Sequence, residues 1–278
     1  MATVALVVHP EHPDAPALAR QTEQWLEAAG HVACRVRDDV DPSAAELDRT
    51  VDLAVSLGGD GTMLRTVALA AAQGVPVLGV NLGRLGYLTE VEPAGLTPAL
   101  ARFLEGDYTL ETRMTLEVTH EGADGAATRP PRVVLNEAAL EKTVPGHTIR
   151  LMASIAGHPF VTYVADGLLV ATPTGSTAYN LSARGPILSP GLRAMVLTPV
   201  SPHMIFDRPL VLEPEQWVRL ELVGPRPAVL VLDGQGAEVL EPGDAVACRM
   251  AERPARFVTF GPRDFFSILR SRFHLPDR

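Results

Sequence analysis

One short segment constrains this chain more than any other. An apolar, strand-like run, Val51–Leu57, leads directly into the loop Gly58–Thr62, whose sequence is Gly-Gly-Asp-Gly-Thr and where a helical pattern begins. Glycines let the backbone turn sharply and bring its N–H groups close to a bound phosphate, and a helix N-terminus adds a positive end. A carboxylate there would repel phosphate unless it accepts a proton or holds a metal ion. The alternative is a tight turn in which Asp60 or Thr62 caps the helix.

Strand-like and helical patterns alternate over residues 1–110. Strands are predicted at Thr3–Val8, His31–Arg37, Val51–Leu57 and Val75–Val80, and helices at Ala15–Ala29, Ser43–Asp48, Thr62–Gln73 and Leu96–Glu105. This alternation predicts an α/β domain with a mainly parallel, Rossmann-like sheet. Ligands bind beyond the carboxyl ends of the strands of such a sheet, so the loops Gly58–Thr62 and Asn81–Leu88 are expected to share one edge.

The pattern changes to β-like alternation after residue 110. Strands are predicted at Met114–His120, Arg132–Leu140, Ile149–Ile155, Val161–Val164, Trp217–Val223, Ala228–Leu232 and Ala245–Met250, with a hairpin connection or mobile loop at 121–131. We therefore expect an N-terminal domain at 1–110 and a C-terminal β-rich, β-sandwich-like domain at 111–255. The tail, 256–278, is expected to pack back on the first domain through a short helix at Phe265–Phe273.

Composition argues against several classes of function. The formal net charge of −9 over 278 residues does not suit non-specific binding to nucleic acid. No apolar run reaches the roughly 18 residues that span a bilayer, and the start lacks the basic segment of a secretory signal, so we expect a cytoplasmic protein. Lys142 is the only lysine, which excludes a Walker-type Gly-Lys-Ser/Thr loop. Phosphates would have to be bound by backbone amides, arginines and a metal ion.

A pair of polar residues falls inside the predicted strand Arg132–Leu140. Neighbouring residues of a strand point to opposite faces, so Asn136 or Glu137 must leave the regular pleat if both contact one ligand. Such side chains could bind a base and ribose hydroxyls. The alternative is that both are solvated residues at the end of a strand.

A longer polar run, Thr172–Asn180, follows Asp166-Gly167 and an apolar stretch. It sets four hydroxyl groups around a proline and a glycine at the start of a helical pattern, which suits ligand binding. The alternative is an extended helix cap centred on Ser176 or Thr177. Tyr179 has two interpretations as well, stacking on a base or packing in the core.

Three further segments contain turn signals. Gly185–Leu188 and Leu197–His203 predict unusual turns, and Asp233-Gly234-Gln235 predicts a hairpin turn. The histidines show no metal-ligand spacing, and the two cysteines, Cys34 and Cys248, are far apart. No residue is therefore assigned as a metal ligand.

Taken in order, these segments resemble the NAD kinase family, within the wider group that includes 6-phosphofructokinases and diacylglycerol kinases. The resemblance rests on Gly58–Thr62, Asn81–Leu88, Asn136-Glu137, Asp166-Gly167, Thr172–Asn180, Gly185–Leu188, Leu197–His203 and Asp233–Gln235. The second and fifth of these segments separate NAD kinases from lipid kinases. The resemblance implies an α/β N-terminal domain, a β-rich C-terminal domain and a NAD site between them.

The resemblance also implies a reaction, which is phosphorylation of the adenosine-ribose 2′-hydroxyl of NAD to give NADP. It makes Asp60 the proton acceptor for that hydroxyl. The implied NAD contacts are Gly61, Asn136, Glu137, Asp166, Thr177, Ala178, Tyr179, Asn180, Leu181, Ser182 and Gln235. Arg65 and His147 are added as phosphate or ribose contacts, with a solvated helix residue and a loop histidine as their alternatives. The resemblance further implies Mg²⁺ carried in with ATP, and a homodimer or homotetramer formed through the β domain.

The chain departs from the family at one point. Many members carry a basic residue two places before the aspartate of the Asp-Gly pair, where this chain has Val164. The departure bears on NADP affinity and on the choice between NAD and NADH. Two other functions stay open, a kinase for another small hydroxyl compound and a non-catalytic NADP-binding regulator. The phosphoryl donor is likewise open among ATP, another nucleotide and polyphosphate.

Overall fold

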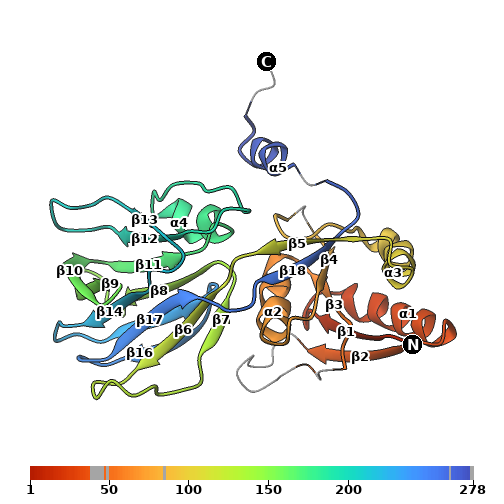
Figure 1. Ribbon diagram of the computed structural model, residues 1–278, viewed down its shortest axis with the longest axis horizontal. Coiled ribbons are helices and arrows are strands. Elements are labelled where there is room, and N and C mark those ends of the chain that lie inside the picture. Colours follow the sequence, from red (N-terminus) through yellow and green to blue (C-terminus); the bar gives the residue numbers. More distant parts are fainter. Residues whose placement is uncertain (38–46, 48–49, 84–85, 263, 276–278) are drawn as a thin grey trace. The chain divides into compact units, whose positions relative to one another are not determined.

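The computed structural model describes residues 1–37, 47, 50–83, 86–262 and 264–275 (Figure 1). The chain forms two compact units, an N-terminal unit made of Met1–Thr112 with Ala255–Arg278, and a sandwich unit made of Arg113–Pro254. The helix predicted at Ser43–Asp48 falls on residues that, apart from Leu47, lie outside the described part of the chain.

The N-terminal unit is built on one sheet, sheet A, with strand order β2-β1-β3-β4-β18-β5. Its strands are β1 (Thr3–Val8), β2 (Val32–Arg37), β3 (Leu53–Gly58), β4 (Val77–Asn81), β5 (Thr109–Arg113) and β18 (Ala255–Thr259). The pairs β1–β2, β1–β3, β3–β4 and β4–β18 are parallel, which confirms the predicted Rossmann-like sheet. All six residues of β3 are buried, because a parallel strand covered on both faces has no solvent side.

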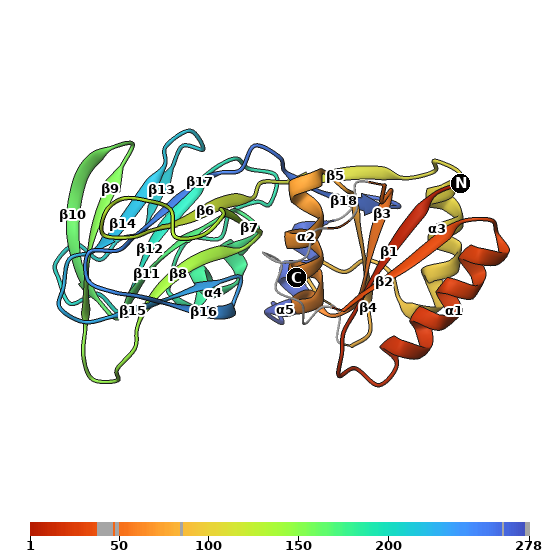
Figure 2. The same cartoon turned by 90° about the horizontal axis from the view of Figure 1, so that it is seen from below.

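Helices cover both faces of sheet A (Figure 2). These helices are α1 (Ala15–Ala28), α2 (Asp60–Ala70) and α3 (Leu96–Leu104), with short 3₁₀ turns η1 (Ala71–Gln73) and η2 (Pro93–Gly95). A further helix, α5 (Phe265–Arg272), has no buried residue. The buried residues of α1 are Ala15, Ala19, Thr22 and Leu26, at the spacing of one helix face. They join α3 and the strands in one apolar core, while α2 lies on the opposite face.

The sandwich unit consists of two antiparallel sheets. Sheet B has the order β10-β9-β14-β17-β6-β7, and sheet C has the order β13-β12-β11-β8-β15-β16. The strands of sheet B are β10 (His158–Ala165), β9 (Ile149–Ile155), β14 (Val218–Leu222), β17 (Ala245–Met250), β6 (Leu116–Glu121) and β7 (Arg132–Val134). Those of sheet C are β13 (Leu210–Leu212), β12 (Met195–Val200), β11 (Gly167–Ala171), β8 (Glu137–Lys142), β15 (Ala228–Leu232) and β16 (Gln235–Leu240).

Alternate residues of both sheets form a single core between them. Leu116 and Val118 of β6 belong to the same buried cluster as Leu140 of β8 and Leu168 of β11. This packing confirms the β-sandwich predicted from period-two alternation. In the described residues, no helix is both long enough and apolar enough to cross a membrane.

Two sequence predictions for the sandwich unit were wrong in detail. The predicted strand Arg132–Leu140 is two strands, because β7 belongs to sheet B and β8 to sheet C, and the chain changes sheet at Leu135 and Asn136. The predicted turn at Leu197–His203 begins inside β12, where Met195–Pro199 is buried between β11 and β13. A central strand can contain a proline only where that residue's N–H is not needed by the ladder.

Candidate functional site

The two glycine-containing loops of the N-terminal unit lie together at the carboxyl edge of sheet A. Strands β3 and β4 are parallel neighbours, and Gly58 pairs with Asn81 at their ends. The N–H of Leu82 then donates to the carbonyl of Gly58 at 3.1 Å. The shared edge expected from the strand-to-loop pattern is therefore present.

Asp60 begins α2 and is held by the second loop. The N-cap position is Gly59, and no side chain makes a capping hydrogen bond there. The carboxylate of Asp60 instead accepts the backbone N–H of Tyr87 at 2.9 Å and that of Leu88 at 3.1 Å. The interpretation of Asp60 as a helix cap is thus wrong, and its carboxylate has a fixed position at the helix N-terminus.

The glycines beside Asp60 have distinct reasons to be glycine. A Cβ on Gly58 would lie 2.2 Å from the Oγ1 of Thr62, which is buried, so the first turn of α2 packs directly on Gly58. Gly61 is exposed, and a Cβ there would meet no atom within 4 Å. Among the described residues there is therefore room for a side chain beside the Cα of Gly61. Arg65 follows one turn later on α2 and is half-buried.

Tyr87, in the loop Asn81–Leu88, lies close enough to Asp60 for the two groups to interact electrostatically. Burial raises the pKa of its hydroxyl, the charge of Arg272 lowers it, and the charge of Asp60 raises it, with a net upward shift. The guanidinium of Arg272, at the end of α5, stands 5.0 Å from the centre of the Tyr87 ring. The last helix therefore contacts the loop that holds Asp60.

The outer face of sheet C and the segment that covers it contain most of the residues predicted to bind NAD. Ala138 and Leu140 of β8 point into the sandwich core, so Glu137, Ala139 and Glu141 lie on the other face. This face is covered by the segment that contains η3 (Gly175–Thr177) and α4 (Tyr179–Ser182), whose apolar side chains pack on Ala139.

Glu137 is the most buried of these carboxyl groups, with 4% of its surface exposed. Its Oε2 atom has no hydrogen-bond partner among the described residues. Burial and, after it, the nearby charge of Asp233 raise the pKa of Glu137, the backbone N–H of Tyr179 lowers it, and the net value is about 8. Asn136 lies just before β8, outside both strands, as expected if the pair leaves the regular pleat.

A second cluster of polar side chains lies at the other end of β8, where Glu141 and Asp166 each have a partner. The hydroxyl of Tyr179 donates to Glu141, and burial together with this hydrogen bond raises the pKa of Tyr179. The Nζ atom of Lys142 lies 2.7 Å from Oδ1 of Asp166. Tyr179 therefore spans the sheet face, with its backbone beside Glu137 and its hydroxyl on Glu141.

The hydroxyl groups of Thr172–Asn180 mostly bind backbone atoms of their own loop. Thr172 donates to the carbonyl of Leu135 at 2.5 Å and accepts the N–H of Gly175 at 3.0 Å. Ser176 donates to the carbonyl of Pro173 at 2.6 Å and accepts the N–H of Leu188 at 2.9 Å. Neither η3 nor α4 has a side-chain cap, so the helix-cap alternative for this run is wrong.

Asn180 is fully buried and its amide is completely used within the protein. The Nδ2 group donates to the carbonyls of Ser176 at 3.1 Å and Pro186 at 3.0 Å, and Oδ1 accepts the hydroxyl of Thr198 at 2.6 Å. A Cβ on Gly185 would lie 1.9 Å from that oxygen. The side chain of Asn180 thus ties the covering loop to β12.

The remaining predicted contacts differ in exposure. Thr177, Ala178 and Leu181 are half-buried, Ser182 is exposed, and Gln235 is half-buried at the start of β16. His147 is exposed in the connection from β8 to β9, beyond the Lys142 end of β8. In the described part of the chain its ring has no hydrogen bond to the Glu137 group. The fold therefore brings Asn136, Glu137, Tyr179 and Gln235 to one region and leaves His147 away from Glu137.

Asp233 belongs to this region and was missed as a site residue. Its carboxylate accepts the backbone N–H groups of Leu135 at 2.9 Å, Asn136 at 2.7 Å and Glu137 at 3.2 Å. The sequence analysis placed it in a hairpin turn and in one of the segments that resemble the family, but not among the site residues. The hairpin is correct, since Asp233 and Gly234 have φ angles of 52° and 68° between β15 and β16. Aspartate is common in such turns for conformational reasons alone, so the turn signal by itself did not indicate a second role.

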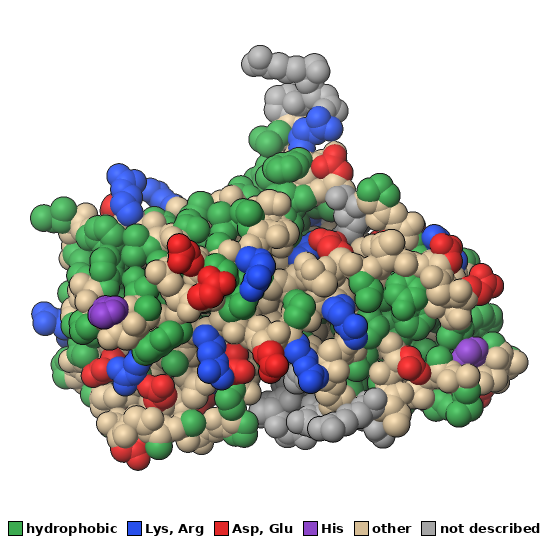
Figure 3. Space-filling model, viewed as in Figure 1, with side chains coloured by type: hydrophobic (Ala, Val, Ile, Leu, Met, Phe, Trp, Pro, Cys, Tyr) green, Lys and Arg blue, Asp and Glu red, His purple; other side chains and the backbone are tan. Residues whose placement is uncertain are grey.

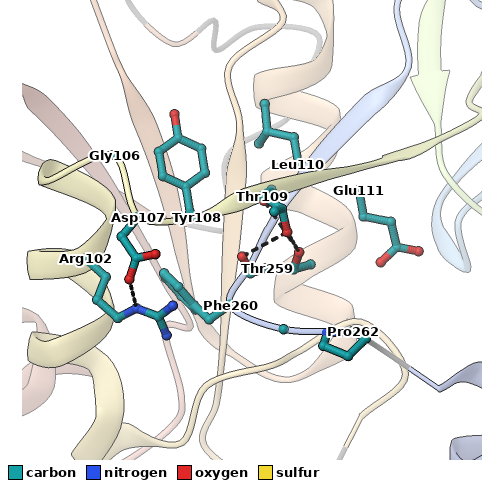
Figure 4. Close-up of a pocket in the computed structure, with 11 residues that line it drawn as sticks. Arg102, Gly106, Asp107, Tyr108, Thr109, Leu110, Glu111, Thr259, Phe260 and Pro262 are labelled. Atoms are coloured by element: carbon teal, nitrogen blue, oxygen red, sulfur yellow. Dashed lines mark hydrogen bonds and ion pairs between the residues drawn. The ribbon is translucent and has the colours of Figure 1, made fainter.

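A cavity of about 620 Å³ lies elsewhere in the N-terminal unit, between the end of α3, β5 and the end of β18 (Figure 4). Two pairs of its polar side chains bind each other, Arg102 with Asp107 at 2.6 Å and Thr109 with Thr259 at 2.7 Å. None of the predicted site residues lines it. Within the described residues, no three histidine, cysteine or acidic side chains gather as they would around a metal ion.

A carboxylate fixed at a glycine-rich strand-to-helix turn, together with a polar region on a β-sandwich, defines a phosphotransferase for a small hydroxyl compound. Comparison with known proteins identifies the family of phosphotransferases to which the chain belongs. The model of the ATP-NAD kinase N-terminal domain matches residues 35–108, and that of the ATP-NAD kinase C-terminal domain matches residues 135–260. The chain belongs to the NAD kinase family of phosphotransferases.

Relatives match along the whole chain. The NAD kinase of Heliobacterium modesticaldum is 44% identical over 282 residues, with 98% of each protein covered. That of Syntrophotalea carbinolica is 37% identical, with 100% of each covered.

Two solved structures share the fold. Yeast NADH kinase complexed with NADH has a TM-score of 0.85 at 22% identity, covering 100% of this chain and 89% of the other. An NAD kinase from Archaeoglobus fulgidus in complex with ATP has a TM-score of 0.77 at 24% identity, covering 99% of each chain.

Proposed function

We propose that this chain transfers the γ-phosphoryl group of ATP to the 2′-hydroxyl of the adenosine ribose of NAD and so makes NADP. The observation that carries the proposal is the fixed carboxylate of Asp60, held at the start of α2 by the N–H groups of Tyr87 and Leu88. Phosphoryl transfer needs an oriented hydroxyl whose proton is accepted as the new bond forms, and Asp60 serves as that acceptor.

The dinucleotide is bound by groups on sheet C and its covering loop. Asn136 and Glu137 hold the adenosine part, and Asp166 orients the dinucleotide. The wall beside it consists of Thr177, Ala178, Tyr179, Asn180, Leu181, Ser182 and Gln235. For Asn180 the contribution comes from its backbone and from the loop it braces, since its side-chain amide is already bonded. Gly61, Arg65 and His147 contact phosphate or ribose groups of a substrate.

Mg²⁺ enters as part of the nucleotide substrate. The oxygen atoms of the triphosphate are the chief ligands of this cation. When bound, this ion neutralises charge on the transferring phosphoryl group. The protein's own part is to orient the hydroxyl and to accept its proton at Asp60.

We also propose a homodimer or homotetramer formed through the sandwich unit, working in the cytoplasm, where NAD and ATP are both present. Large apolar side chains are exposed on this unit, among them Phe160 at 45%, Val211 at 55% and Ile205 at 103%. Figure 3 shows hydrophobic side chains gathered on this part of the surface. Light scattering of the eluted protein tests the assembly, and a monomeric mass at micromolar concentration would contradict it.

The reaction is tested by incubating the purified protein with Mg²⁺, NAD and either ATP or polyphosphate, and measuring NADP. The wild type is expected to form NADP, and the preferred donor is read from the two arms. Asp60→Asn is expected to lower turnover about 10²- to 10⁴-fold and to keep NAD binding. Asp14→Asn is the matched control, because Asp14 precedes α1 and makes no capping bond.

Two results would contradict the proposal. Equal turnover by Asp60→Asn and wild type would remove the role of Asp60 as proton acceptor. NAD binding without any NADP from the wild type, with either donor, would show that the reaction is wrong.

A further inference from the structure

The carboxylate of Asp233 accepts backbone hydrogen bonds that a neighbouring strand would otherwise accept. The donors are at and beside Asn136 and Glu137, the pair proposed to bind NAD. At Leu135 and Asn136 the chain leaves sheet B for sheet C, so their N–H groups have no neighbouring strand to bind. Oδ1 of Asp233 accepts the N–H groups of Asn136 and Glu137, and Oδ2 accepts that of Leu135. The N–H of Asp233 returns to the carbonyl of Glu137 at 3.0 Å. Asp233 therefore sets the backbone position of both residues.

The same arrangement places two carboxyl groups in one enclosed region. Burial raises the pKa of Asp233, three N–H donors lower it, and the net value is about 6. The Oε2 of Glu137, in contrast, has no partner among the described residues and is shielded from water. Ionising both carboxyl groups in such surroundings is unfavourable, because the two negative charges repel each other and burial removes their hydration. The proton of the pair therefore stays on the group with fewer hydrogen-bond donors. That group is Glu137.

Among the described residues, one other group near Glu137 favours its ionised form. Tyr179 of α4 directs its backbone N–H at Glu137, but its hydroxyl donates to Glu141. Asp166 is paired with Lys142 at the far end of β8. The only shift that favours ionisation comes from that single N–H, and the pKa of Glu137 rises to about 8.

We propose that Asp233 is a positioning residue of the NAD site, which holds Asn136 and Glu137 in place and keeps Glu137 as a neutral acid that donates a hydrogen bond from Oε2 to the bound dinucleotide. This inference rests on the proposed binding of NAD. A neutral acid suits an anionic ligand, because an ionised carboxylate would repel the two phosphates of NAD. The proposed hydrogen bond also supplies a partner for Oε2 of Glu137, which has none among the described residues.

The expected signature is weaker NAD binding at alkaline pH. Because the protonated form binds, affinity is full below the pKa of Glu137 and falls as pH rises through it, by about tenfold per pH unit once most of the group is ionised. The dissociation constant for NAD, measured by calorimetry from pH 6.5 to 9.5, reports this change without turnover. The pKa of Glu137 itself is measured by carbon-13 NMR of labelled glutamate in the free protein.

Two variants separate the roles. Glu137→Gln has a permanent N–H donor, so its NAD affinity is expected to stay within about threefold of the wild-type value at pH 7 and to lose the alkaline decline. Asp233→Asn removes the negative charge next to Glu137. It also replaces one carboxylate oxygen, which accepts backbone N–H groups, with an NH₂ group that can only donate. It is expected to raise KM for NAD about tenfold with a smaller change in kcat, and to move the decline to lower pH. Glu215→Gln, an exposed carboxyl of the same unit, is the control.

The outcomes distinguish this inference from the proposed reaction. Glu137 found ionised at pH 7, or an NAD affinity that is flat from pH 6.5 to 9.5 in the wild type, overturns the inference even if NADP forms normally. NAD binding that weakens as expected without NADP formation leaves the inference standing and contradicts the reaction. If Asp233→Asn does not fold, the wild-type titration and Glu137→Gln still decide the protonation state.

Discussion

Gly86 lies against Asp60, and a Cβ atom on Gly86 would stand 2.1 Å from the Oδ1 of that carboxylate. No side chain fits at such a distance. The two residues that follow Gly86 supply the N–H groups that hold Asp60, so the loop can donate both hydrogen bonds only if it passes directly over the carboxylate. The glycine is therefore part of the way Asp60 is positioned, although the two residues are far apart in sequence.

The first prediction follows from this contact. Gly86→Ala should push Asp60 or the loop aside by about 1 Å and lower kcat about 10²-fold, because a shift of that size disrupts the alignment of the hydroxyl with its proton acceptor. Gly83→Ala is the matched control in the same loop, since a Cβ there meets no atom within 4 Å. Steady-state kinetics and a thermal melt of both variants check the prediction. Equal kcat values for the two variants would contradict it.

The second prediction concerns Asn180, whose amide is bonded on all sides within the protein. Asn180→Ala should lower the free energy of unfolding by about 2–4 kcal/mol, because it leaves a buried hydroxyl and two carbonyls without partners. Urea denaturation measures the change. Ser182→Ala, an exposed position in the same helix, should leave the stability nearly unchanged. Unaltered stability together with a raised KM for NAD would instead mean that the Asn180 side chain serves the ligand.

The third prediction concerns Glu238, which links β16 to sheet B. Its carboxylate lies 2.6 Å from Nδ1 of His120 and 2.5 Å from a nitrogen of Arg132. Burial raises the pKa of Glu238, but these partners lower it more, so the pKa lies below the usual 4.5. A lowered pKa contributes stability that is present above pH 4.5 and is lost as pH falls through the value in the folded protein.

Glu238→Gln should therefore be less stable than wild type by about 2 kcal/mol near pH 7, with a difference that shrinks as pH falls below about 4.5. Urea denaturation at several pH values tests this. The control is Glu117→Gln, which breaks an exposed pair with Arg249 and should cost less than about 1 kcal/mol. A difference between Glu238→Gln and wild type that does not depend on pH would contradict the interpretation.

The sequence predicted those features that depend on neighbours along the chain. The apolar runs of β1, β3 and β4 and the helices between them follow from local periodicity, and parallel pairing then requires their loops to share an edge. Period-two alternation likewise predicted the sandwich. The prediction failed at Arg132–Leu140, because the local pattern is strand-like throughout and the break between β7 and β8 depends on Asp233, about a hundred residues away.

By itself, the sequence determined the class of each unit, the family to which the chain belongs and the position of Asp60 at a strand-to-helix turn. These follow from periodicity, glycine placement and motif order, which are local properties of the chain. Only the tertiary structure decided that Asp60 is held by Tyr87 and Leu88, that the Asn180 side chain braces a loop, and that Asp233 accepts the N–H groups of Asn136 and Glu137. Each of these depends on which distant backbone N–H and C=O groups come within hydrogen-bond distance, and that is set by the packing of strands from separate parts of the chain.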